Sequence, residues 1–353
     1  MTSKVAIIEF EGNPREPLKQ ALDMIGRMDD LNTVERSVVV KVGVFSHKAE
    51  NHTSVSVVDA ITNLFDKAPK IFLAESDNYQ GTGTERLQIW KELFTERIVP
   101  FNLSEDSDTR RVKLANEEMN LSHILFKPNV LVNTHILRSF ENGSILKNLF
   151  GCIPTPKKAK YHKILPTLLA DVYEAIGGVD LAVLDGTYFW RDAGNAPVQM
   201  NTLLAGRDAV AVETVGATLA GLNPQKMPVI QEFVKRGLGE GNLENIKLMG
   251  TSLEHIKEKF VSAATTQKKL LAQRKGPQTW GGHAYHALEG LIREGFFKHP
   301  NERTMEDVVK ALEAKGLSTK GKEGKIASSL ARRVKKGVLK KSKVSNRWIY
   351  WTE

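Results

Sequence analysis

Short apolar runs alternate with helical patterns over the first two-thirds of the chain. Several runs are rich in Val, Ile and Leu without strict polar alternation, which is typical of strands covered on both faces. The predicted strands are Val5–Phe10, Ser37–Phe45, Lys70–Glu75, Asn129–Ile136, Asp180–Leu184 and Ile246–Met249. The predicted helices include Val55–Phe65, Gly83–Phe94, Leu165–Ile176, Asp208–Leu219 and Lys226–Arg236. This order predicts an α/β domain with a largely parallel, doubly wound sheet over residues 1–262.

The pattern changes after residue 262. Residues 263–282 are polar and then rich in Gly and Pro, so we interpret them as a linker. Residues 283–353 predict helices near His283–Phe297, from Thr304 and at about Lys322–Lys336, followed by two β-prone runs around a polar turn. This segment is similar to the winged-helix modules of many microbial proteins. We therefore expect a small winged helix-turn-helix domain after the α/β domain.

Two helices of this second domain carry specific signals. Thr304 and Asp307 have the spacing of a capping box, in which each side chain accepts from the other residue's main-chain amide. Ile326, Leu330 and Val334 form a single apolar stripe on the third helix, so the residues beside that stripe are expected to face solvent.

Composition narrows the class of protein. Hydrophobic residues at 41% and charged residues at 26% are ordinary for a globular protein. No apolar run approaches the roughly 20 residues that span a bilayer, and the first apolar stretch is broken by acids, unlike a signal peptide. The single cysteine, Cys152, excludes an intrachain disulfide and a cysteine-rich metal site. We therefore expect a cytoplasmic protein without membrane contact.

The net charge of +9 is unevenly distributed. Residues 1–267 hold 30 Lys and Arg against 33 Asp and Glu, whereas residues 283–353 hold 16 against 8. The second domain is therefore the part expected to meet a polyanion.

Two stretches about sixty residues apart contain recognisable motifs. The first runs from Asn133 to Pro154 and includes Lys147-Asn148 and Gly151, with Lys160-Tyr-His162 close behind. The second contains Asp185-Gly186, then Gly206-Arg-Asp208 through Glu213, then Gly221-Leu-Asn-Pro224. Together they resemble a family known as the domain of unknown function 362. The resemblance implies where a site lies, with a Lys-Asn-x-x-Gly signature at Lys147, but it implies no reaction.

The chain departs from that family in three respects. Relatives commonly have Lys-Pro-Asn after the second strand, where this chain has Lys41-Val-Gly43, and they usually have Asp where Glu213 stands. Many relatives also carry a ferredoxin-like segment with clustered cysteines. This chain lacks such a cluster, so no iron–sulfur cluster is expected.

Polar residues follow several predicted strands, where ligands gather in doubly wound sheets. Glu75-Ser-Asp77, Thr134-His135 and Asp185-Gly186 each close a strand, and a histidine with carboxylates suits proton transfer or a divalent metal. The candidate acid/base residues are His135, His162 and Asp185, and the candidate metal ligands are Asp77 and Glu213. Alternatively, Asp77 and Asp185 only cap turns.

A second set of residues suggests an anionic small-molecule ligand. The Lys147 ammonium beside the Asn148 carboxamide suits a phosphate or carboxylate, and His162 lies in a cationic loop. A solvated basic loop is the alternative interpretation. Gly206 allows a tight turn and Asp208 can cap the next helix, and both are also candidate ligand-binding residues.

The predicted winged helix has its own candidate site. Residues of the third helix that lie beside the apolar stripe would face a nucleic-acid groove. Cationic side chains of the two β-prone runs, which form the wing, would contact the phosphate backbone. The candidate residues are Lys325, Arg332, Arg333, Lys336, Lys340, Lys341, Lys343 and Arg347. Protein docking or dimerisation is the alternative.

Three hypotheses of function follow. The α/β domain binds an anionic small molecule or metal, with or without catalysis, and the winged helix docks to nucleic acid or to a partner. Alternatively, the protein is a ligand-responsive DNA-binding regulator. The third hypothesis is a scaffold with a degenerate site.

Overall fold

The computed structural model describes residues 2–26, 28–46, 51–139, 141–190, 198–262 and 280–353. The chain forms two compact units, Met1–Leu271 and Ala272–Glu353. Most of the predicted linker, residues 263–282, lies outside the described residues.

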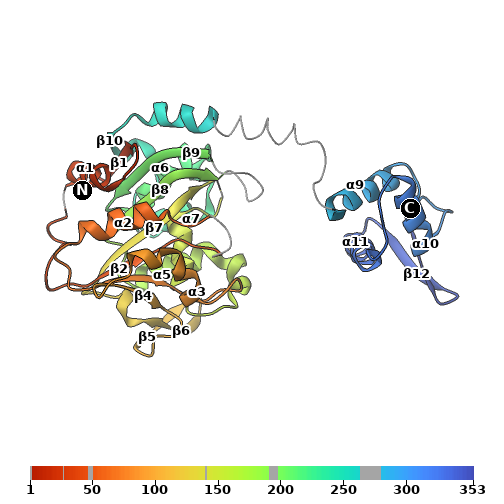
Figure 1. Ribbon diagram of the computed structural model, residues 1–353, viewed down its shortest axis with the longest axis horizontal. Helices are drawn as coiled ribbons and strands as arrows, with labels where there is room; N and C mark the ends of the chain where they lie inside the picture. Colours follow the sequence, from red (N-terminus) through yellow and green to blue (C-terminus); the bar gives the residue numbers. More distant parts are fainter. Residues whose placement is uncertain (1, 27, 47–50, 140, 191–197, 263–279) are drawn as a thin grey trace. The chain divides into compact units, whose positions relative to one another are not determined.

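The first unit is built on an eight-stranded sheet (Figure 1). Its strands, in spatial order, are β10 (Lys247–Gly250), β1 (Lys4–Glu9), β9 (Val198–Gly206), β8 (Leu181–Trp190), β7 (Val130–Arg138), β2 (Val38–Lys41), β3 (Ile71–Glu75) and β4 (Ile98–Asn102). Only β9 runs antiparallel to its neighbours, so the prediction of a largely parallel sheet is confirmed.

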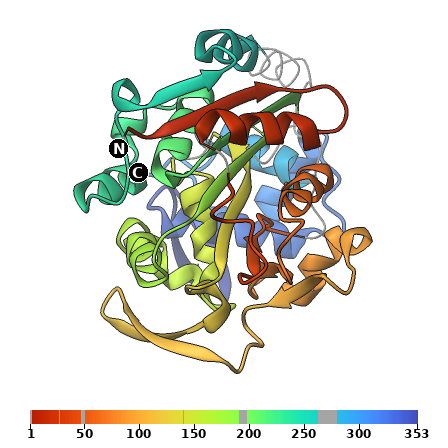
Figure 2. The same ribbon diagram turned by 90° about the vertical axis from the view of Figure 1, so that its left-hand side faces the viewer.

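Helices cover both faces of this sheet (Figure 2). One face packs against α1 (Arg15–Ile25), α2 (Val55–Leu64) and the 3₁₀ helix η1 (Gln88–Leu93). The other packs against α4 (Ile145–Asn148), α5 (Leu165–Ala175), α6 (Ala209–Leu219) and α7 (Pro228–Lys235). Val38 and Val40 belong to the first core and Val39 to the second, which explains the uninterrupted valines of β2.

The sequence pattern missed several features of this unit, including the edge strand β4. Strand β9 was not predicted: its first half mixes apolar and polar residues, and Asn201 has a positive φ of 49° that interrupts the extended backbone. The predicted helix Gly83–Phe94 is a short α-helix, α3 (Gly83–Leu87), followed by η1. A hairpin of β5 (Thr109–Leu114) and β6 (Glu117–Ser122) was also missed, although both residues of its two-residue turn have positive φ, as tight hairpins require.

The second unit contains the predicted helices and hairpin. It comprises α9 (Trp280–Arg293), β11 (Arg303–Thr304), α10 (Met305–Ala314), α11 (Glu323–Lys335), β12 (Lys340–Val344) and β13 (Arg347–Trp351). The strands form an antiparallel sheet in the order β11-β13-β12. The Thr304–Asp307 capping box is confirmed, and Ile326 and Leu330 of the predicted stripe are fully buried.

None of the helices within the described ranges has the length and hydropathy that a membrane-spanning helix needs.

Candidate functional site

A buried ion pair joins the carboxyl ends of β2 and β3. Lys41 Nζ lies 2.7 Å from Glu75 Oε2, and neither side chain is more than 3% exposed. The Arg86 guanidinium lies 3.4 Å from Glu75 Oε1. Lys41 Nζ also donates to the Val42 carbonyl at 2.9 Å. A buried ion pair is stable only when its remaining polar atoms also have partners. Here Lys41 and Arg86 share the Glu75 carboxylate, one at each oxygen.

Asn148 ties this ion pair to the neighbouring elements. Its Oδ1 accepts from Lys41 Nζ at 3.2 Å, while its Nδ2 lies within 3.1 Å of the Lys41 and Thr134 carbonyls and 2.8 Å from Asn133 Oδ1. These contacts join β2, β7 and α4. The polar atoms of this amide are therefore bonded within the protein, so its main effect is to position the Lys147-Asn148 segment.

Gly151 of the signature lies against the same ion pair. A Cβ added there would lie 2.5 Å from both Glu75 Oε1 and Lys41 Nζ. A side chain at this position would have to displace the paired groups, so glycine lets the backbone after α4 cover the ion pair as it stands.

Glu213 connects the second signature to the first. Its carboxylate, buried on α6, accepts from the Ser144 amide at 2.9 Å and from the Leu146 amide at 2.8 Å, at the start of α4. Burial raises the pKa of Glu213, whereas these amides and the charge of Arg138 lower it. Glu213 therefore holds the helix that carries Lys147.

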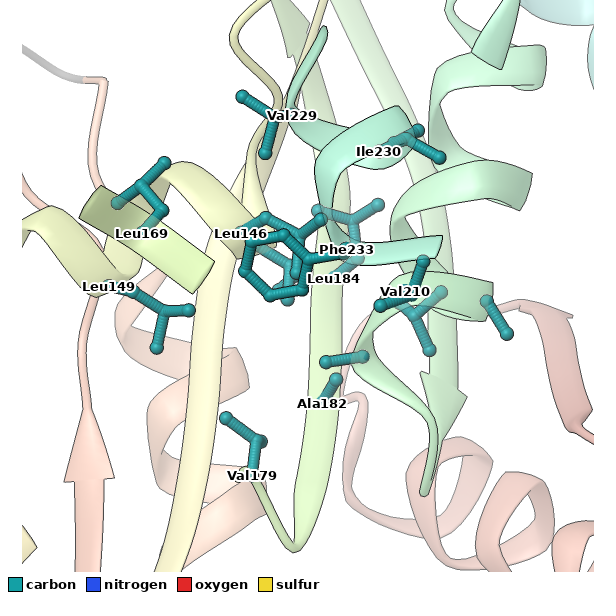
Figure 3. Close-up of a cluster of buried hydrophobic side chains, with 14 of the residues drawn as sticks. Leu146, Leu149, Leu169, Val179, Ala182, Leu184, Val210, Val229, Ile230 and Phe233 are labelled. Atoms are coloured by element: carbon teal, nitrogen blue, oxygen red, sulfur yellow. The ribbon is translucent and has the colours of Figure 1, made fainter. Parts of the chain in front are cut away.

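Apolar packing fixes the other side of the same segment. Figure 3 shows Leu146 close to Phe233 of α7 and to Leu184 of β8, with Leu149 nearby. Leu146 and Leu149 are both fully buried. Lys147 lies between these two leucines in the sequence, but its side chain lines a cavity instead.

His135 and Arg138 form a pair at the end of β7. Arg138 Nη2 lies 2.8 Å from His135 Nε2, and His135 Nδ1 lies 3.2 Å from the Ile136 carbonyl. A guanidinium can only donate, so Nε2 accepts and Nδ1 carries the proton. Burial, then the charges of Arg138 and Lys41, hold the pKa of His135 well below its usual value. The neutral imidazole thus orients Arg138, and an acid/base role would require this hydrogen bond to break.

A cavity of about 220 Å³ adjoins this network. Its lining includes one carboxylate, Glu75, and the cationic side chains Arg86, Arg138, Lys147 and Lys158. Because Glu75 is already paired with Lys41 and Arg86, the lining carries an excess of positive charge.

Lys147 and Lys158 are the two lysines of this lining. Lys147 Nζ is buried, has no hydrogen-bond partner in the described part of the chain, and lies 4.0 Å from the centre of the Phe150 ring. Burial, with the charges of Arg138 and Lys158, lowers the pKa of Lys147 to about 7. Burial likewise lowers the pKa of Lys158 to about 8, and its Nζ donates to Ser76 Oγ at 2.6 Å. A bound anion would supply the missing countercharge.

Aromatic side chains line the mouth of the cavity. Phe45 and Tyr79 meet edge to face with ring centres 5.6 Å apart, and their exposed fractions are 39% and 72%. His162 is exposed, lies with its ring centre 5.5 Å from that of Phe150, and has Nδ1 3.1 Å from the Ala159 carbonyl. Of the predicted site residues, the structure therefore brings His135, Lys147, Asn148 and His162 together around one cavity.

The predicted carboxylates lie elsewhere. Asp185 accepts from the amides of Ser54 at 2.7 Å and Thr187 at 2.8 Å, and Asp77 accepts from the Gly83 amide at 2.8 Å. These contacts match the turn-capping alternative. Within the described residues, no group of three His, Cys, Asp or Glu side chains is arranged to hold a metal ion, so Asp77 and Glu213 gain no support as metal ligands.

Gly206 and Asp208 lie at the opposite edge of the sheet. Strand β9 is antiparallel, so its last residue, Gly206, pairs with Val5 and Ala182 near the starts of β1 and β8. Asp208 accepts from the Val210 and Ala211 amides and from Ser3 Oγ at 2.6 Å. Asp208 is therefore a helix cap, and neither residue lines the cavity.

The second unit presents most of its predicted cations to solvent. The exposed residues are Lys325, Arg332, Lys336, Lys340, Lys341, Lys343 and Arg347. Arg333 is the exception, and the prediction that it faces solvent is wrong. Its guanidinium is buried, donating to Glu289 Oε1 at 2.8 Å and to Ser329 Oγ at 2.6 Å. Arg333 therefore joins α11 to α9 and is removed from the candidate interface.

Five charged residues of the site were absent from the predicted set. They are Lys41, Glu75, Arg86, Arg138 and Lys158. A lysine directly after three valines of a buried strand was a usable signal for Lys41, and Glu75 closes the next predicted strand. Arg86, Arg138 and Lys158 lie in segments whose pattern gives no such signal.

The match to a known family lies in the first unit. No curated protein and no solved structure matches the chain. A family model, described as a domain of unknown function, matches residues 38–218, which is more than half of the chain. That range contains every residue lining the cavity, together with Glu213. The chain therefore belongs to the domain of unknown function 362 family.

Proposed function

We propose that the first unit binds a small anionic molecule, a carboxylate or a phosphate, in the cavity between α3, α4 and the ends of β2, β3 and β7. The charge balance of the lining carries this proposal. Four cationic side chains surround the cavity against one carboxylate, which already has two cationic partners. Buried charges without countercharge are costly, so such an arrangement favours a site completed by its ligand.

The size and shape of the cavity support a metabolite rather than a polymer. Its volume of about 220 Å³ lies below the ~300–1,000 Å³ of pockets for drug-sized ligands. The cationic groups lie beside the strand ends, and Phe45 and Tyr79 stand at the mouth. A ligand would thus place its anionic group inward and its remaining atoms against the aromatic rings.

Calorimetric titration of the full chain with oxalate tests this proposal. Lys158→Met should weaken binding by about tenfold or more, the worth of one charge-assisted hydrogen bond. Lys163→Met is the matched control, because Lys163 is exposed in the same 3₁₀ helix, η4 (Lys158–Ile164), and does not line the cavity. Absence of oxalate binding to the wild type, or equal losses in the two variants, would refute the proposal.

We further infer that residues 280–353 form a winged helix that contacts nucleic acid. The order of helix, strand, two helices and a hairpin supports this fold. Lys325, Arg332 and Lys336 are exposed on α11, the helix in the recognition position, and the hairpin adds exposed cations at its base and tip. The excess of Lys and Arg over Asp and Glu in this unit favours a polyanionic partner over a neutral protein surface.

Fluorescence anisotropy with labelled duplex DNA of mixed sequence tests this inference. The double variant Lys325→Gln/Arg332→Gln should weaken binding by about tenfold or more, because it removes two phosphate contacts. Lys226→Gln/Lys235→Gln changes the net charge equally on an exposed surface of the first unit. Equal losses in both double variants, or no binding by the wild type, would contradict a nucleic-acid role for α11.

A further inference from the structure

Lys147 differs from the other lysines of the site in having no polar partner. Lys41 is bonded to Glu75 and Lys158 to Ser76, whereas Lys147 Nζ is buried against the Phe150 ring without a hydrogen-bond partner among the described residues. A buried, unbonded amine that lines a cavity has the environment of a lysine nucleophile.

We propose that Lys147 is an amine nucleophile that forms an imine with the carbonyl carbon of a small oxo acid, whose carboxylate is held by Arg138 and Lys158. This inference rests on the proposed anion site and names its ligand class. All three side chains line the same cavity, so one small molecule can meet the amine and the two cations together.

The reaction needs no oxidant or reductant. The lone pair of Lys147 Nζ attacks the carbonyl carbon, the C–N bond forms, and a proton moves from nitrogen to oxygen to give a carbinolamine. The C–O bond then breaks, nitrogen gives up its second proton, and oxygen leaves as water. His162 lines the same cavity at its mouth, where it can carry that proton from nitrogen to the departing oxygen.

The electrostatics favour Lys147 over an ordinary surface lysine. An amine attacks only when it is neutral, and the pKa of Lys147 is lowered to about 7 by burial and by the neighbouring cations. Near pH 7 about half of such amines are neutral, against fewer than about one in a thousand exposed lysines. Desolvation beside another cation is an established route to an activated lysine.

Reductive trapping tests the inference. Full-length protein is incubated with pyruvate and borohydride, and the modified peptides are mapped by mass spectrometry. We expect the adduct on Lys147 at a rate about a hundredfold or more above that on exposed Lys163, from the difference in neutral fraction. Oxalate, which has no ketone, should protect Lys147. Lys147→Arg removes the nucleophilic amine and should abolish trapping at this position, whereas Lys163→Met, outside the cavity, should keep both oxalate binding and the adduct on Lys147.

The outcomes separate this inference from the function on which it rests. Oxalate binding without an adduct on Lys147, or an adduct spread evenly over exposed lysines, would overturn the imine and leave the anion site intact. Loss of oxalate binding to the wild type would overturn both. Should Lys147→Arg fail to fold, oxalate protection of the wild-type peptide still decides the question.

Discussion

Both units of this protein contain a group of cationic side chains, but they hold them in opposite ways. In the first unit the cations surround a small cavity, where burial lowers the pKa of Lys147 to about 7 and that of Lys158 to about 8. In the second unit they stand in solvent on α11 and on the hairpin. Charges fixed in a cavity select a small ligand by position, whereas solvated charges act together on an extended polyanion.

Each region also contains a buried cation that belongs to the architecture. Lys41 is paired with Glu75, and Arg333 is paired with Glu289. The partners of these two groups come from other elements of the same unit. These two paired cations hold the fold, whereas the cations assigned to ligands by the proposed functions lie in the cavity and on the exposed surface of α11 and the hairpin.

The largest expected difference between the two regions is in their response to salt. If α11 and the hairpin make about four phosphate contacts, DNA affinity should fall about a hundredfold between 50 and 200 mM salt. Oxalate affinity should change far less, because buried charges are screened weakly. Anisotropy and calorimetry over one salt series measure both. Similar salt slopes would remove the distinction between the two regions.

Lys41→Met and Lys147→Met should change stability in opposite directions. The first leaves the buried Glu75 carboxylate with the Ser76 amide and the more distant Arg86 guanidinium, and should cost about 3–5 kcal/mol. The second removes an unpaired buried amine and should stabilise the protein by about 1–2 kcal/mol near pH 7. Urea unfolding measures both, and destabilisation by Lys147→Met would show that its ammonium has a partner in the fold.

The comparison of wild type with Lys147→Met also predicts how stability depends on pH. The pKa of Lys147 is about 7 in the folded protein and about 10.4 in an unfolded chain. Between these values the unfolded state binds more protons, so the Lys147 contribution to stability rises with pH. The stability gap between wild type and Lys147→Met should therefore narrow towards pH 10. A constant gap would contradict the lowered pKa.

Adjacent arginines of α11 provide a matched pair in the second unit. Arg333→Met breaks the buried contacts with Glu289 and Ser329 and should cost about 2–3 kcal/mol. Arg332→Met, on the exposed side, should change stability by less than about 0.5 kcal/mol and weaken DNA binding. Thermal unfolding separates the two roles. Equal destabilisation would place both arginines in the core.

A modest loss of stability is expected on substitution of Glu213. Glu213→Gln replaces one acceptor oxygen with a donor that faces the Ser144 and Leu146 amides, so it should cost about 1–2 kcal/mol. The shifted α4 should also weaken oxalate binding. A fully stable variant with lower affinity would instead place Glu213 in contact with the ligand.

The architecture was largely predictable, because apolar runs identify buried strands whatever their order. Strand order, however, decides which polar residues meet. Lys41 follows three valines, but its partner is known only once β2 lies beside β3. The positions of Gly206 and Asp208 depend on strand direction in the same way. Because β9 runs antiparallel, the helix start that follows it lies away from the carboxyl ends of the parallel strands.

Helix α11 shows that a single apolar stripe in the sequence does not identify every residue that a helix buries. Ile326, Leu330 and Val334 define one line, but a helix in a three-helix unit buries a wider face. Ser329 and Arg333 are four residues apart on the flank of that face, and both are buried towards α9. Polar side chains with a partner across the interface cannot be distinguished from solvated ones by spacing alone.

Proton uptake on anion binding tests the central claim most directly. Oxalate is titrated into the full chain near pH 8 in two buffers of different ionisation enthalpy, with Lys147→Met as the comparison. Because a bound anion raises the pKa of Lys147 from about 7, we predict uptake of up to about one proton by the wild type and much less by the variant. Binding without proton uptake, or the same uptake in Lys147→Met, would contradict an anion site built on this lysine.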